Sequence, residues 1–476
     1  MQKTFRKTKI ICTLGPVSES TEMIEKLAMA GMNIVRLNFS HGSHEEHGLR
    51  MDRVHEINDR MGFNIGVMLD TKGPEIRCGD MENGALQFKK GDMVNVVREV
   101  VLGNNERFNI STPELFDDVQ VGNYLLIDDG KMRLTVVEMP EAGVLKCRVE
   151  NSGVIKTRKG VNVPNVRLSM PFLSEKDEAD IRFGCKKDID FVAASFVRRA
   201  EDVKVIRAIL LDEGKKRTQI IAKIENQEGY DNLESILHVA DGVMVARGDL
   251  GVEVSTQLVP IYQKGIIKKA NEFGKPVITA THMLESMMAN PRPTRAEASD
   301  VANAVLDGSD CIMLSGETAA GEYPIEAVQT MDTIARAIEE TIPYKERLDL
   351  SIRSSHKTVQ DAIGISVADA SLQLDRVKAI IAFTQGGSTA RRISKFRPSV
   401  PIFAVTFTRT VQRKLEINWG VFPLFSDVQN EMTNDDELAS IIAKDNGLMV
   451  GDYVIITAGY PTGEGTANMM KIVEVK

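Results

Sequence analysis

Cysteine is scarce in this sequence of 476 residues, and its five cysteines show no pairing pattern. They are odd in number, scattered along the chain and never spaced as C-x-x-C: Cys12, Cys78, Cys147, Cys185 and Cys311. Disulfide frameworks and thiolate zinc sites both depend on paired cysteines at characteristic spacings. The pattern therefore argues against both and favours a reducing compartment.

Long hydrophobic runs are also missing. No stretch reaches the roughly 18 consecutive apolar residues of a transmembrane helix. The basic start, residues 1–9, is followed by only Ile10, Ile11 and Cys12 before Thr13 interrupts the apolar run. A secretory leader needs an apolar core of about 7–15 residues. We therefore expect the protein to remain in the cytoplasm.

The sequence has no excess of positive charge and no block of basic residues. Its formal net charge of -8 argues against nucleic acid as a partner. It also lacks the G-x-x-x-x-G-K-[ST] phosphate loop, so a nucleotide would not be held in that way. Any phosphorylated substrate would need a local cationic pocket inside an acidic molecule.

The sequence does contain a repeated alternation of short β-branched runs and helical stretches. A chain of this length exceeds one compact core, so two or three domains are expected. The alternation predicts strands at residues 9–13, 33–37, 64–69, 191–196, 220–224, 242–245, 277–280 and 311–314. Eight parallel βα units close a TIM barrel, although an open doubly wound sheet has the same alternation.

Two regions depart from this rhythm. Residues 73–169 combine clustered Gly, Asn and Pro with alternating runs, which is typical of antiparallel β structure. We expect this region to form a β-rich lid domain inserted after the third barrel strand. The barrel domain would then comprise residues 1–72 and 170–345, and residues 346–476 would form a C-terminal α/β domain.

Polar residues follow most of the predicted barrel strands. Function in TIM barrels is carried by the C-terminal ends of the strands. Alternation along the second strand places Arg36, Asn38 and Ser40 on one face. The other strand ends supply Asp70, Thr71, Lys223, Glu225, Asp249, Thr281 and Glu317, with Arg77 just beyond the third strand. Each alone is most often a solvated loop residue, but a barrel would bring them all to one mouth.

Lys223, Glu225 and Asp249 indicate a metal and phosphate site within this group. Two carboxylates on neighbouring strands can supply the one or two protein ligands that Mg2+ typically takes. Lys223 beside such a metal would face a phosphate group or a developing enolate, and phosphoryl transfer depends on charge neutralisation of this kind. The structural alternative is a buried ion pair between Lys223 and Glu225.

A second group, Asn38, Ser40, Asp70 and Thr71, offers only side-chain oxygen and a single formal charge. Such a set suits a weakly charged cation such as K+ better than a transition metal. On spacing alone this is a weak pattern.

Three histidines, His41, His44 and His47, have a spacing that resembles a metal cluster. Ser43 and Glu46 form a capping box, however, so His44 and His47 are expected on the first turns of a helix. A histidine metal site is therefore not favoured.

Seven stretches, in order across nearly the whole chain, resemble the pyruvate kinase family: KIICTLGP (9–16), RLNFSHG (36–42), DTKGPEIR (70–77), IAKIENQEG (221–229), VARGDLGV (245–252), NPRPTRAEASD (290–300) and LSGET (314–318). The resemblance implies a barrel with an inserted β lid and a C-terminal effector domain, usually assembled as a homotetramer. It also implies transfer of a phosphoryl group from phosphoenolpyruvate to ADP in the final step of glycolysis, followed by protonation of the enolate to pyruvate. The cofactors would be Mg2+ or Mn2+, and K+.

The resemblance assigns roles at the matching positions. The catalytic residues would be Lys223, Arg36, Arg77, Thr281 and Glu317. The substrate would also contact Gly248 and Asp249, and Mg2+ would be bound by Glu225 and Asp249. The nucleotide would contact Asn38, His41, Arg77 and Lys159. K+ would be held by Asn38, Ser40, Asp70 and Thr71, and Glu75 is the acidic residue of K+-dependent members.

The sequence departs from the family pattern at two positions. His282 stands where the family usually has glutamine, so a titratable group would lie near the site of enolate protonation. Tyr230 replaces a commonly aliphatic residue, with no evident chemical consequence.

In the C-terminal domain, residues 384–389 precede a helix that we expect to begin near Ala390. Amides and hydroxyls at a helix N-terminus can bind an anion, but an ordinary strand-to-helix turn explains the run equally well. The resemblance places a sugar-phosphate effector here, on Thr384, Gln385, Gly386, Ser388, Thr389 and Gly463. The closing loop, residues 459–465, contains Glu464 and no Lys or Arg, so the identity of the effector stays open.

Two other functions compete with this hypothesis. A metal-dependent aldolase or lyase that handles pyruvate enolate could use a similar barrel, but it would not need Lys159 or a nucleotide site. A metabolite-sensing protein with an inactive barrel would be expected to have lost Lys223 or one of the metal carboxylates, and both are present.

Overall fold

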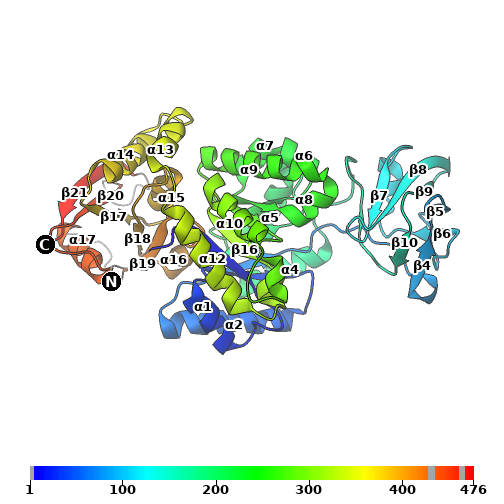
Figure 1. Cartoon of the computed structure of the whole chain (residues 1–476), viewed down its shortest axis with the longest axis horizontal. Coiled ribbons are helices and arrows are strands. Elements are labelled where there is room, and N and C mark those ends of the chain that lie inside the picture. Colours follow the sequence, from blue (N-terminus) through cyan, green and yellow to red (C-terminus); the bar gives the residue numbers. More distant parts are fainter. Residues whose placement is uncertain (1–4, 427–434, 460–466) are drawn as a thin grey trace.

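The computed structural model describes residues 5–426, 435–459 and 467–476. Figure 1 shows an elongated chain, with a barrel in the middle, a β-rich insertion at one end and a C-terminal α/β region at the other. Among the described residues, no helix combines the length and the apolar character needed to cross a membrane.

Eight parallel strands form the central barrel: β1 (Lys9–Thr13), β2 (Ile34–Asn38), β3 (Gly66–Asp70), β12 (Phe191–Ala194), β13 (Gln219–Ile224), β14 (Gly242–Ala246), β15 (Val277–Ala280) and β16 (Cys311–Leu314). They follow one another around the barrel in chain order, and β16 pairs with β1 to close it. The open doubly wound sheet is therefore excluded. All eight predicted strands are present, with ends that differ by at most two residues.

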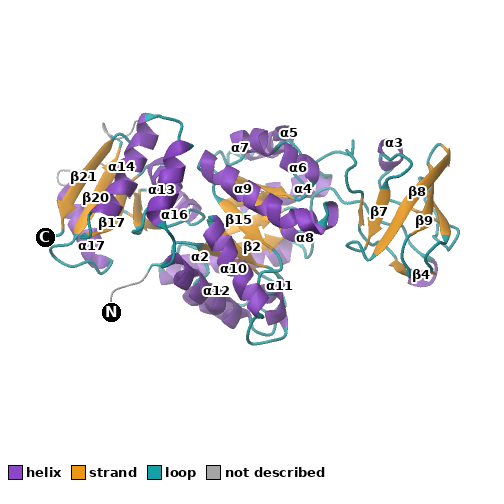
Figure 2. Cartoon of the chain, turned by 45° about the horizontal axis from the view of Figure 1, so that its top comes forward, coloured by secondary structure: helices purple, strands orange, loops and turns teal. Residues whose placement is uncertain are grey.

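Helices surround these strands, as Figure 2 shows. They are α1 (Thr21–Ala30), α2 (His44–Met61), α4 (Glu175–Lys186), α5 (Ala200–Asp212), α6 (Gln227–Asp231), α7 (Leu233–Val239), α8 (Arg247–Glu253), α9 (Val259–Phe273), α10 (Arg295–Asp307), α11 (Gly316–Ala319) and α12 (Pro324–Glu339). Short 3-10 turns, η2 (Thr256–Leu258) and η3 (Glu285–Met288), lie between them. The predicted capping boxes at Ser43 and Thr294 begin α2 and α10.

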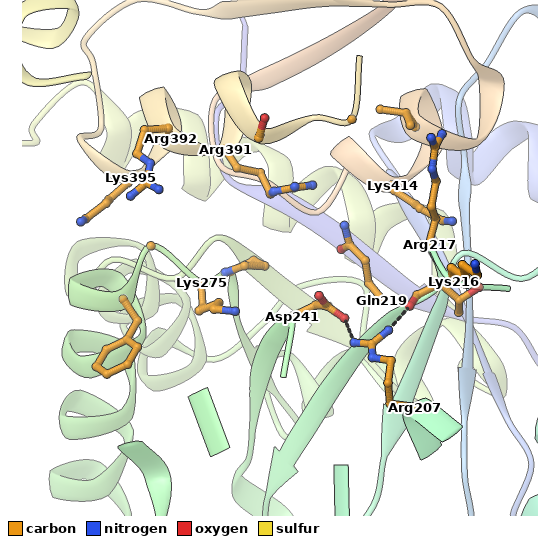
Figure 3. Close-up of a pocket in the computed structure, with 17 residues that line it drawn as sticks. Arg207, Lys216, Arg217, Gln219, Asp241, Lys275, Arg391, Arg392, Lys395 and Lys414 are labelled. Atoms are coloured by element: carbon orange, nitrogen blue, oxygen red, sulfur yellow. Dashed lines mark hydrogen bonds and ion pairs between the residues drawn. The ribbon is translucent and has the colours of Figure 1, made fainter. Parts of the chain in front are cut away.

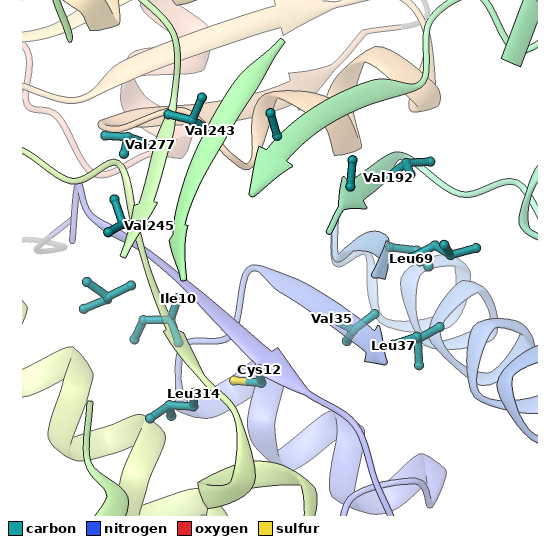
Figure 4. Close-up of a cluster of buried hydrophobic side chains, with 14 of the residues drawn as sticks. Ile10, Cys12, Val35, Leu37, Leu69, Val192, Val243, Val245, Val277 and Leu314 are labelled. Carbon is teal, nitrogen blue, oxygen red and sulfur yellow. The ribbon is translucent and has the colours of Figure 1, made fainter. Parts of the chain in front are cut away.

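The barrel strands are buried on both faces, as parallel strands between two apolar layers must be. One set of side chains packs outward against the helices, including Ile10, Val35, Leu69, Val243 and Leu314 (Figure 4). The alternate set fills the barrel interior, including Ile11, Ile34, Met68, Phe191, Ile221 and Met244. This packing holds the strand ends rigidly, and rigid elements are what a catalytic site needs.

The insertion after β3 has its own sheets and its own apolar core. Its elements are η1 (Glu82–Gly84), β4 (Ala85–Phe88), β5 (Met93–Val97), β6 (Arg107–Asn109), α3 (Leu115–Asp118), β7 (Tyr124–Ile127), β8 (Met132–Glu141), β9 (Val144–Val149), β10 (Gly153–Lys156) and β11 (Val161–Asn162). The pairing is antiparallel, as predicted, except that β6 runs parallel to β5.

The C-terminal region is a sheet of order β19-β18-β17-β20-β21 flanked by helices. Its elements are α13 (Tyr344–Arg353), α14 (Val359–Gln373), β17 (Val377–Phe383), α15 (Ser388–Lys395), β18 (Ile402–Thr406), α16 (Arg409–Leu415), β19 (Val421–Phe425), α17 (Asp435–Asp445), β20 (Tyr453–Ala458) and β21 (Met469–Glu474). The helix predicted to begin near Ala390 is α15, and it begins two residues earlier, at Ser388. Gly387 takes a left-handed φ of 86° and donates its amide to Thr384 Oγ1, so the turn is already complete at Ser388.

The C-terminal region packs against the floor of the barrel, opposite the mouth. Ile417 joins the apolar cluster inside the barrel. Around it, Arg413 pairs with Asp190 at 3.0 Å, and Arg397 pairs with Asp310 at 3.0 Å. Because these ion pairs are buried and hydrogen-bonded, they fix the two domains against each other.

Candidate active site

A cavity of about 720 Å³ lies between the barrel mouth and the inserted lid. Its walls include ten of the predicted site residues: Arg36, Asn38, Ser40, His41, Glu75, Arg77, Lys159, Lys223, Glu225 and Asp249. They come from β2, the segment after β3, the lid, β13 and α8, which are distant in sequence. The closure of the barrel is what brings them together.

Lys223, near the end of β13, is the centre of the polar network below this cavity. Its Nζ lies 2.7 Å from Ser195 Oγ, 3.0 Å from Asp70 Oδ1 and 3.1 Å from Glu225 Oε1. Burial by itself lowers the pKa of Lys223, but Asp70 and Glu225 outweigh it and the pKa lies above its usual range. The lysine therefore remains cationic near neutral pH. The ion pair between Lys223 and Glu225 is therefore present. It is one part of a network in which Lys223 also contacts Asp70 and Ser195.

Asp70 links Lys223 to Arg36. Arg36 Nε lies 2.5 Å from Asp70 Oδ2, and the Arg36 guanidinium also donates to Thr13 Oγ1 at 3.1 Å. Burial raises the pKa of Asp70, but the two cations outweigh that effect and hold the pKa below its ordinary value. One shared carboxylate thus orients two cations whose side chains line the cavity, leaving positive charge available to a phosphate group.

Glu225 and Asp249 form an acidic pair beside this cationic group. Glu225 is fully buried, and its Oε2 accepts a short hydrogen bond from the amide of Phe196. Its buried Oε1 accepts no hydrogen bond of good geometry from any described residue, although Lys223 Nζ is close. Burial raises the pKa of Glu225; Lys223 opposes this rise, and Asp249 adds to it. A cation at this place would satisfy Oε1 and relieve the carboxylate repulsion, so the pair fits a hard divalent metal.

The four residues predicted to bind K+ lie beside that network. Asn38 and Ser40 line the cavity, whereas Asp70 and Thr71 are buried behind it. Asn38 Oδ1 accepts the Ser40 amide at 3.1 Å, and Thr71 Oγ1 accepts the Ser195 amide at 3.1 Å. The set offers oxygen alone, which is the chemistry that an alkali cation requires.

At the rim of the cavity, two cations predicted to contact substrates, Arg77 and Lys159, are paired with carboxylates. Arg77 makes two contacts of 2.8 Å with Glu75, which also pairs with Lys72 at 2.6 Å. Lys159, from the lid, pairs with Asp128 at 2.8 Å. These groups are partly exposed, so an anionic ligand can replace the carboxylates at little cost.

Next to the acidic pair, a hydrogen bond connects Gly248 with Thr281, which His282 follows in the chain. None of the three residues lines the cavity. Gly248 N donates to Thr281 Oγ1 at 2.8 Å. Thr281 and His282 both have left-handed backbone conformations, with φ of 69° and 52°. Such a conformation is rare for a β-branched residue and is typical of functional sites.

Glu317 is placed differently from the other predicted catalytic residues. Its buried carboxylate accepts the amides of Leu284 at 3.0 Å and Ser315 at 2.7 Å. It therefore connects the loops that follow β15 and β16. It does not line the cavity, and its catalytic role stays a prediction.

Sequence analysis missed Ser195, which directly follows β12. Its hydroxyl accepts from Lys223 and lies 2.6 Å from the Thr71 carbonyl oxygen. A polar residue at the end of the fourth barrel strand was the pattern that could have identified it.

A contact between lid and barrel was also missed. Asn162 Nδ2 donates to Glu253 Oε1 at 2.7 Å, and burial raises the pKa of Glu253 to about 7. The distance between the two residues in sequence left no pattern that predicts their contact.

Two of the three histidines with metal-like spacing have hydrogen-bonding partners within the chain. His44 and His47 lie on the first turns of α2, as predicted. His44 Nε2 lies 2.7 Å from Asp180, and His47 Nε2 lies 2.7 Å from the carbonyl oxygen of His41. Throughout the described ranges, no group of three or more His, Cys, Asp or Glu side chains is arranged to hold a metal ion. A metal at Glu225 and Asp249 would therefore take its remaining ligands from water and substrate.

The predicted effector residues are divided in the structure. Gly386 and Ser388 line a second pocket, which lies on the barrel side of the C-terminal domain. Thr384 accepts the Gly387 amide and shapes the turn before α15. Gly463 lies outside the described residues.

Comparison with known proteins identifies the family. A model of the pyruvate kinase barrel domain matches residues 5–328, and a model of the pyruvate kinase alpha/beta domain matches residues 361–473. A pyruvate kinase of Staphylococcus haemolyticus is 52% identical over 473 residues, which cover 98% of this chain and 80% of that protein. A pyruvate kinase of Geobacillus stearothermophilus is 51% identical over 470 residues, covering 98% of this chain and 80% of the relative.

A solved structure agrees with these matches. The crystal structure of a pyruvate kinase from Cryptosporidium parvum superposes with a TM-score of 0.95 at 40% identity, covering 99% of this chain and 96% of that one. Agreement in sequence and in three-dimensional structure extends over the barrel, the lid and the C-terminal domain. This chain belongs to the pyruvate kinase family.

Proposed function

We propose that this chain transfers the phosphoryl group of phosphoenolpyruvate to ADP, giving pyruvate and ATP in the final step of glycolysis. The observation that carries the proposal is the network of Lys223, Arg36 and Asp70 beside Glu225 and Asp249. It presents two oriented cations and an acidic pair to one cavity, which matches the needs of phosphoryl transfer between two anionic substrates.

Arg36 and Lys223 would bind the phosphate of phosphoenolpyruvate, with Arg77 closing over it once released from Glu75. Lys223 would also stabilise the enolate oxygen left after transfer, because its ammonium is buried and held in place by three partners. Thr281, held by the Gly248 amide, would orient the enolate for protonation. The neighbouring His282 offers a titratable group near that position.

Glu225 and Asp249 are proposed to hold Mg2+ or Mn2+. When bound, the metal neutralises charge on the phosphoryl oxygens. The buried Glu225 Oε1, which accepts no hydrogen bond of good geometry from a described residue, supports this assignment. The rest of the site would be completed by water and by substrate oxygens.

Asn38, Ser40, Asp70 and Thr71 are proposed to hold K+, with Glu75 as the nearby acidic residue. In this arrangement Asp70 is shared between the cation and its present partners, Arg36 and Lys223. The nucleotide would lie towards the lid, in contact with Asn38, His41, Arg77 and Lys159. Glu317 would act by supporting the loops around Thr281.

We further propose the domain limits predicted from sequence, with breaks near residues 72, 169 and 345. The position of β4 to β11 between barrel strands β3 and β12 supports the first two. A homotetramer and a sugar-phosphate effector are proposed on family membership. A cytoplasmic location is proposed because all five cysteines are free and buried.

The proposal is tested by measuring pyruvate formation from phosphoenolpyruvate with and without ADP, in the presence of Mg2+ and K+. We expect turnover only when ADP is present. Equal release of pyruvate without ADP would instead indicate a lyase or phosphatase. No turnover under any of these conditions would indicate an inactive barrel.

A further inference from the structure

The lid is attached to the barrel by two connectors, and buried side chains show where each one passes between the domains. On the outgoing connector, Leu69 packs in the apolar layer around the barrel, whereas Ile76 packs in the core of the lid. On the returning connector, Met170 packs against the lid core and Phe172 packs in the barrel layer. The two short stretches between these residues therefore set the position of the whole lid.

Asp177, near the start of α4, holds the outgoing connector. Its side-chain Oδ1 accepts the backbone amides of Lys72 at 3.0 Å and Gly73 at 3.2 Å. Its Oδ2 accepts the hydroxyl of Ser174 at 2.7 Å, where the returning connector becomes helix. Asp177 is fully buried, and hydrogen bonds to a carboxylate shielded from water are strong. One side chain thus joins the barrel ends of both connectors.

The place of Asp177 in its helix shows that this hold goes beyond ordinary helix capping. Ser174 is the N-cap of α4, which makes Asp177 the third residue of the helix. In α2 and α10 the corresponding residues, Glu46 and Glu297, turn back to accept the amide of their own N-cap residue. The Asp177 carboxylate instead accepts amides from a segment more than 100 residues earlier in the chain. It is directed at the connector.

Gly73 shows how closely the outgoing connector passes the barrel. Its φ of 76° lies in the left-handed region that glycine adopts without strain. A Cβ at this position would lie 2.8 Å from Ser195 Cβ and 3.1 Å from Phe196 Cδ2. The amide that Asp177 holds therefore belongs to a residue pressed against Ser195. Because Ser195 is a partner of Lys223, the connector is in direct contact with the catalytic network.

The segment that Asp177 holds leads in one direction to the predicted K+ site and in the other to the lid. Thr71 lies directly before it and contacts Ser195 twice, at 3.1 Å through Oγ1 and at 2.6 Å through its carbonyl oxygen. Further along the same segment, Arg77 donates to the carbonyl oxygen of Arg158 in the lid at 2.7 Å. A displacement of the segment would therefore move a cation ligand and the lid together.

The returning connector is held separately, by Arg198. The Arg198 guanidinium donates to the carbonyl oxygens of Leu168 at 2.8 Å and Met170 at 3.2 Å. Arg198 is buried, and its own amide donates to Asp202 at 2.8 Å. If the outgoing connector were released, the lid would therefore stay attached through the returning one and turn about it.

We propose that Asp177 is a positioning residue for the transfer reaction, which holds the outgoing connector so that the lid stays over the cavity and Thr71 stays at the cation site. This inference rests on the proposed function, in which Lys159 of the lid contacts the nucleotide and Thr71 binds K+. Asp177 is not among the described residues that line the cavity, so it acts through the connector. Its loss leaves Lys223 and Arg36 in place and loosens the hold on the nucleotide.

The first measurement follows the position of the lid without any turnover. Spin labels are attached at Lys90→Cys in the lid and Lys268→Cys on α9, because both positions are exposed and all five native cysteines are buried. Pulsed electron paramagnetic resonance then gives the distribution of distances between lid and barrel. Asp177→Ala should widen this distribution about twofold, because one of the two connectors loses its hold.

Steady-state kinetics measure the consequence for the reaction. Asp177→Ala should raise KM for ADP about tenfold and KM for phosphoenolpyruvate about twofold at most, because misplacement of the lid affects the nucleotide first. A residue that only stabilised the fold would lower the amount of active enzyme and leave both KM values unchanged. Asp177→Asn keeps an oxygen that accepts both amides, so it should restore most of the loss.

Ser174→Ala decides the matter if Asp177→Ala does not fold. It changes an exposed residue, removes only the hydroxyl that orients the carboxylate, and should raise KM for ADP about threefold. Asp180→Ala is the matched control: the same substitution at a buried position of the same helix, whose partners are His44 and Lys176. It should change neither the distance distribution nor either KM.

The proposal is overturned if Asp177→Ala and Ser174→Ala leave both the distance distribution and the KM values unchanged. It is also overturned if Asp177→Asn loses as much as Asp177→Ala, or if Asp180→Ala has the same effects. Failure of the original chain to use phosphoenolpyruvate and ADP would refute the proposed function instead. The distance measurement would still decide whether Asp177 holds the lid.

Discussion

The two cavities at opposite ends of the barrel handle charge in different ways. At the mouth, cations and carboxylates are interleaved: Lys223 and Arg36 share Asp70, and Glu225 lies beside Asp249. At the floor, among the residues that line the second pocket (Figure 3), basic residues outnumber acidic ones eight to one. Interleaved charges suit a reaction in which a metal and two anionic substrates meet. The floor has no such balance among its described residues, so it lacks the acidic pair that a divalent metal would need.

The largest predicted effect concerns Lys223, the buried lysine at the mouth. Lys223→Met should lower kcat by at least about 10³-fold, because it removes a buried cation aimed at the transferring group and enolate. Binding of phosphoenolpyruvate should be largely retained, since Arg36 remains. Steady-state kinetics and equilibrium binding measure the two quantities separately. Near-normal turnover would show that Lys223 has no role in the chemical step.

The acidic pair should show the next largest effect. Glu225→Gln should reduce kcat/KM by about 10²-fold and raise the Mg2+ concentration needed for half-maximal activity, because Mg2+ binds carboxylate oxygen far better than amide. Glu253→Gln is the matched control, since Glu253 lines the same cavity and the substitution is identical. An unchanged Mg2+ requirement in Glu225→Gln would remove this residue from the metal site.

Replacing Glu75 tests the alkali cation. Glu75→Lys should reduce the stimulation by K+ by about tenfold, since a fixed ammonium supplies the positive charge that K+ otherwise brings. It also frees Arg77 and Lys72 from their shared carboxylate. Activity is measured across K+ concentrations with Na+ held at constant ionic strength. Unchanged dependence on K+ would count against the proposed site.

The smallest effect is predicted for His282, the departure from the family pattern. His282→Gln should change the shape of the pH profile for pyruvate formation with little loss of maximal rate, because the imidazole is a titratable group next to Thr281. Initial rates across pH measure the profile. Superimposable profiles would make His282 a structural residue.

The barrel and the main site were predictable from sequence because both depend on local patterns. Strand periodicity located all eight barrel strands, and strand ends located Lys223, Glu225 and Arg36. The left-handed conformation of Thr281 was not predictable, since β-branched residues rarely adopt it. Ser195 was missed because the predicted fourth strand, residues 191–196, ran past it, whereas β12 ends at Ala194 and leaves Ser195 at the strand end.

The cavity at the barrel floor was beyond prediction for a different reason. Its cations come from five separate segments that meet only when the C-terminal domain packs on the barrel. Lys414 on its own is an unremarkable lysine of a short helix, and its burial depends on that packing. The composition did not suggest a basic cavity either, because the chain as a whole is acidic.

The most direct test follows the phosphoryl group itself. Phosphorus NMR of a reaction containing phosphoenolpyruvate, ADP, Mg2+ and K+ distinguishes each phosphorus atom in the mixture. The account predicts that each phosphoenolpyruvate consumed yields one γ-phosphate of ATP, and that Lys223→Met stops this conversion on the same time scale. Consumption of phosphoenolpyruvate with release of inorganic phosphate and no ATP would contradict it.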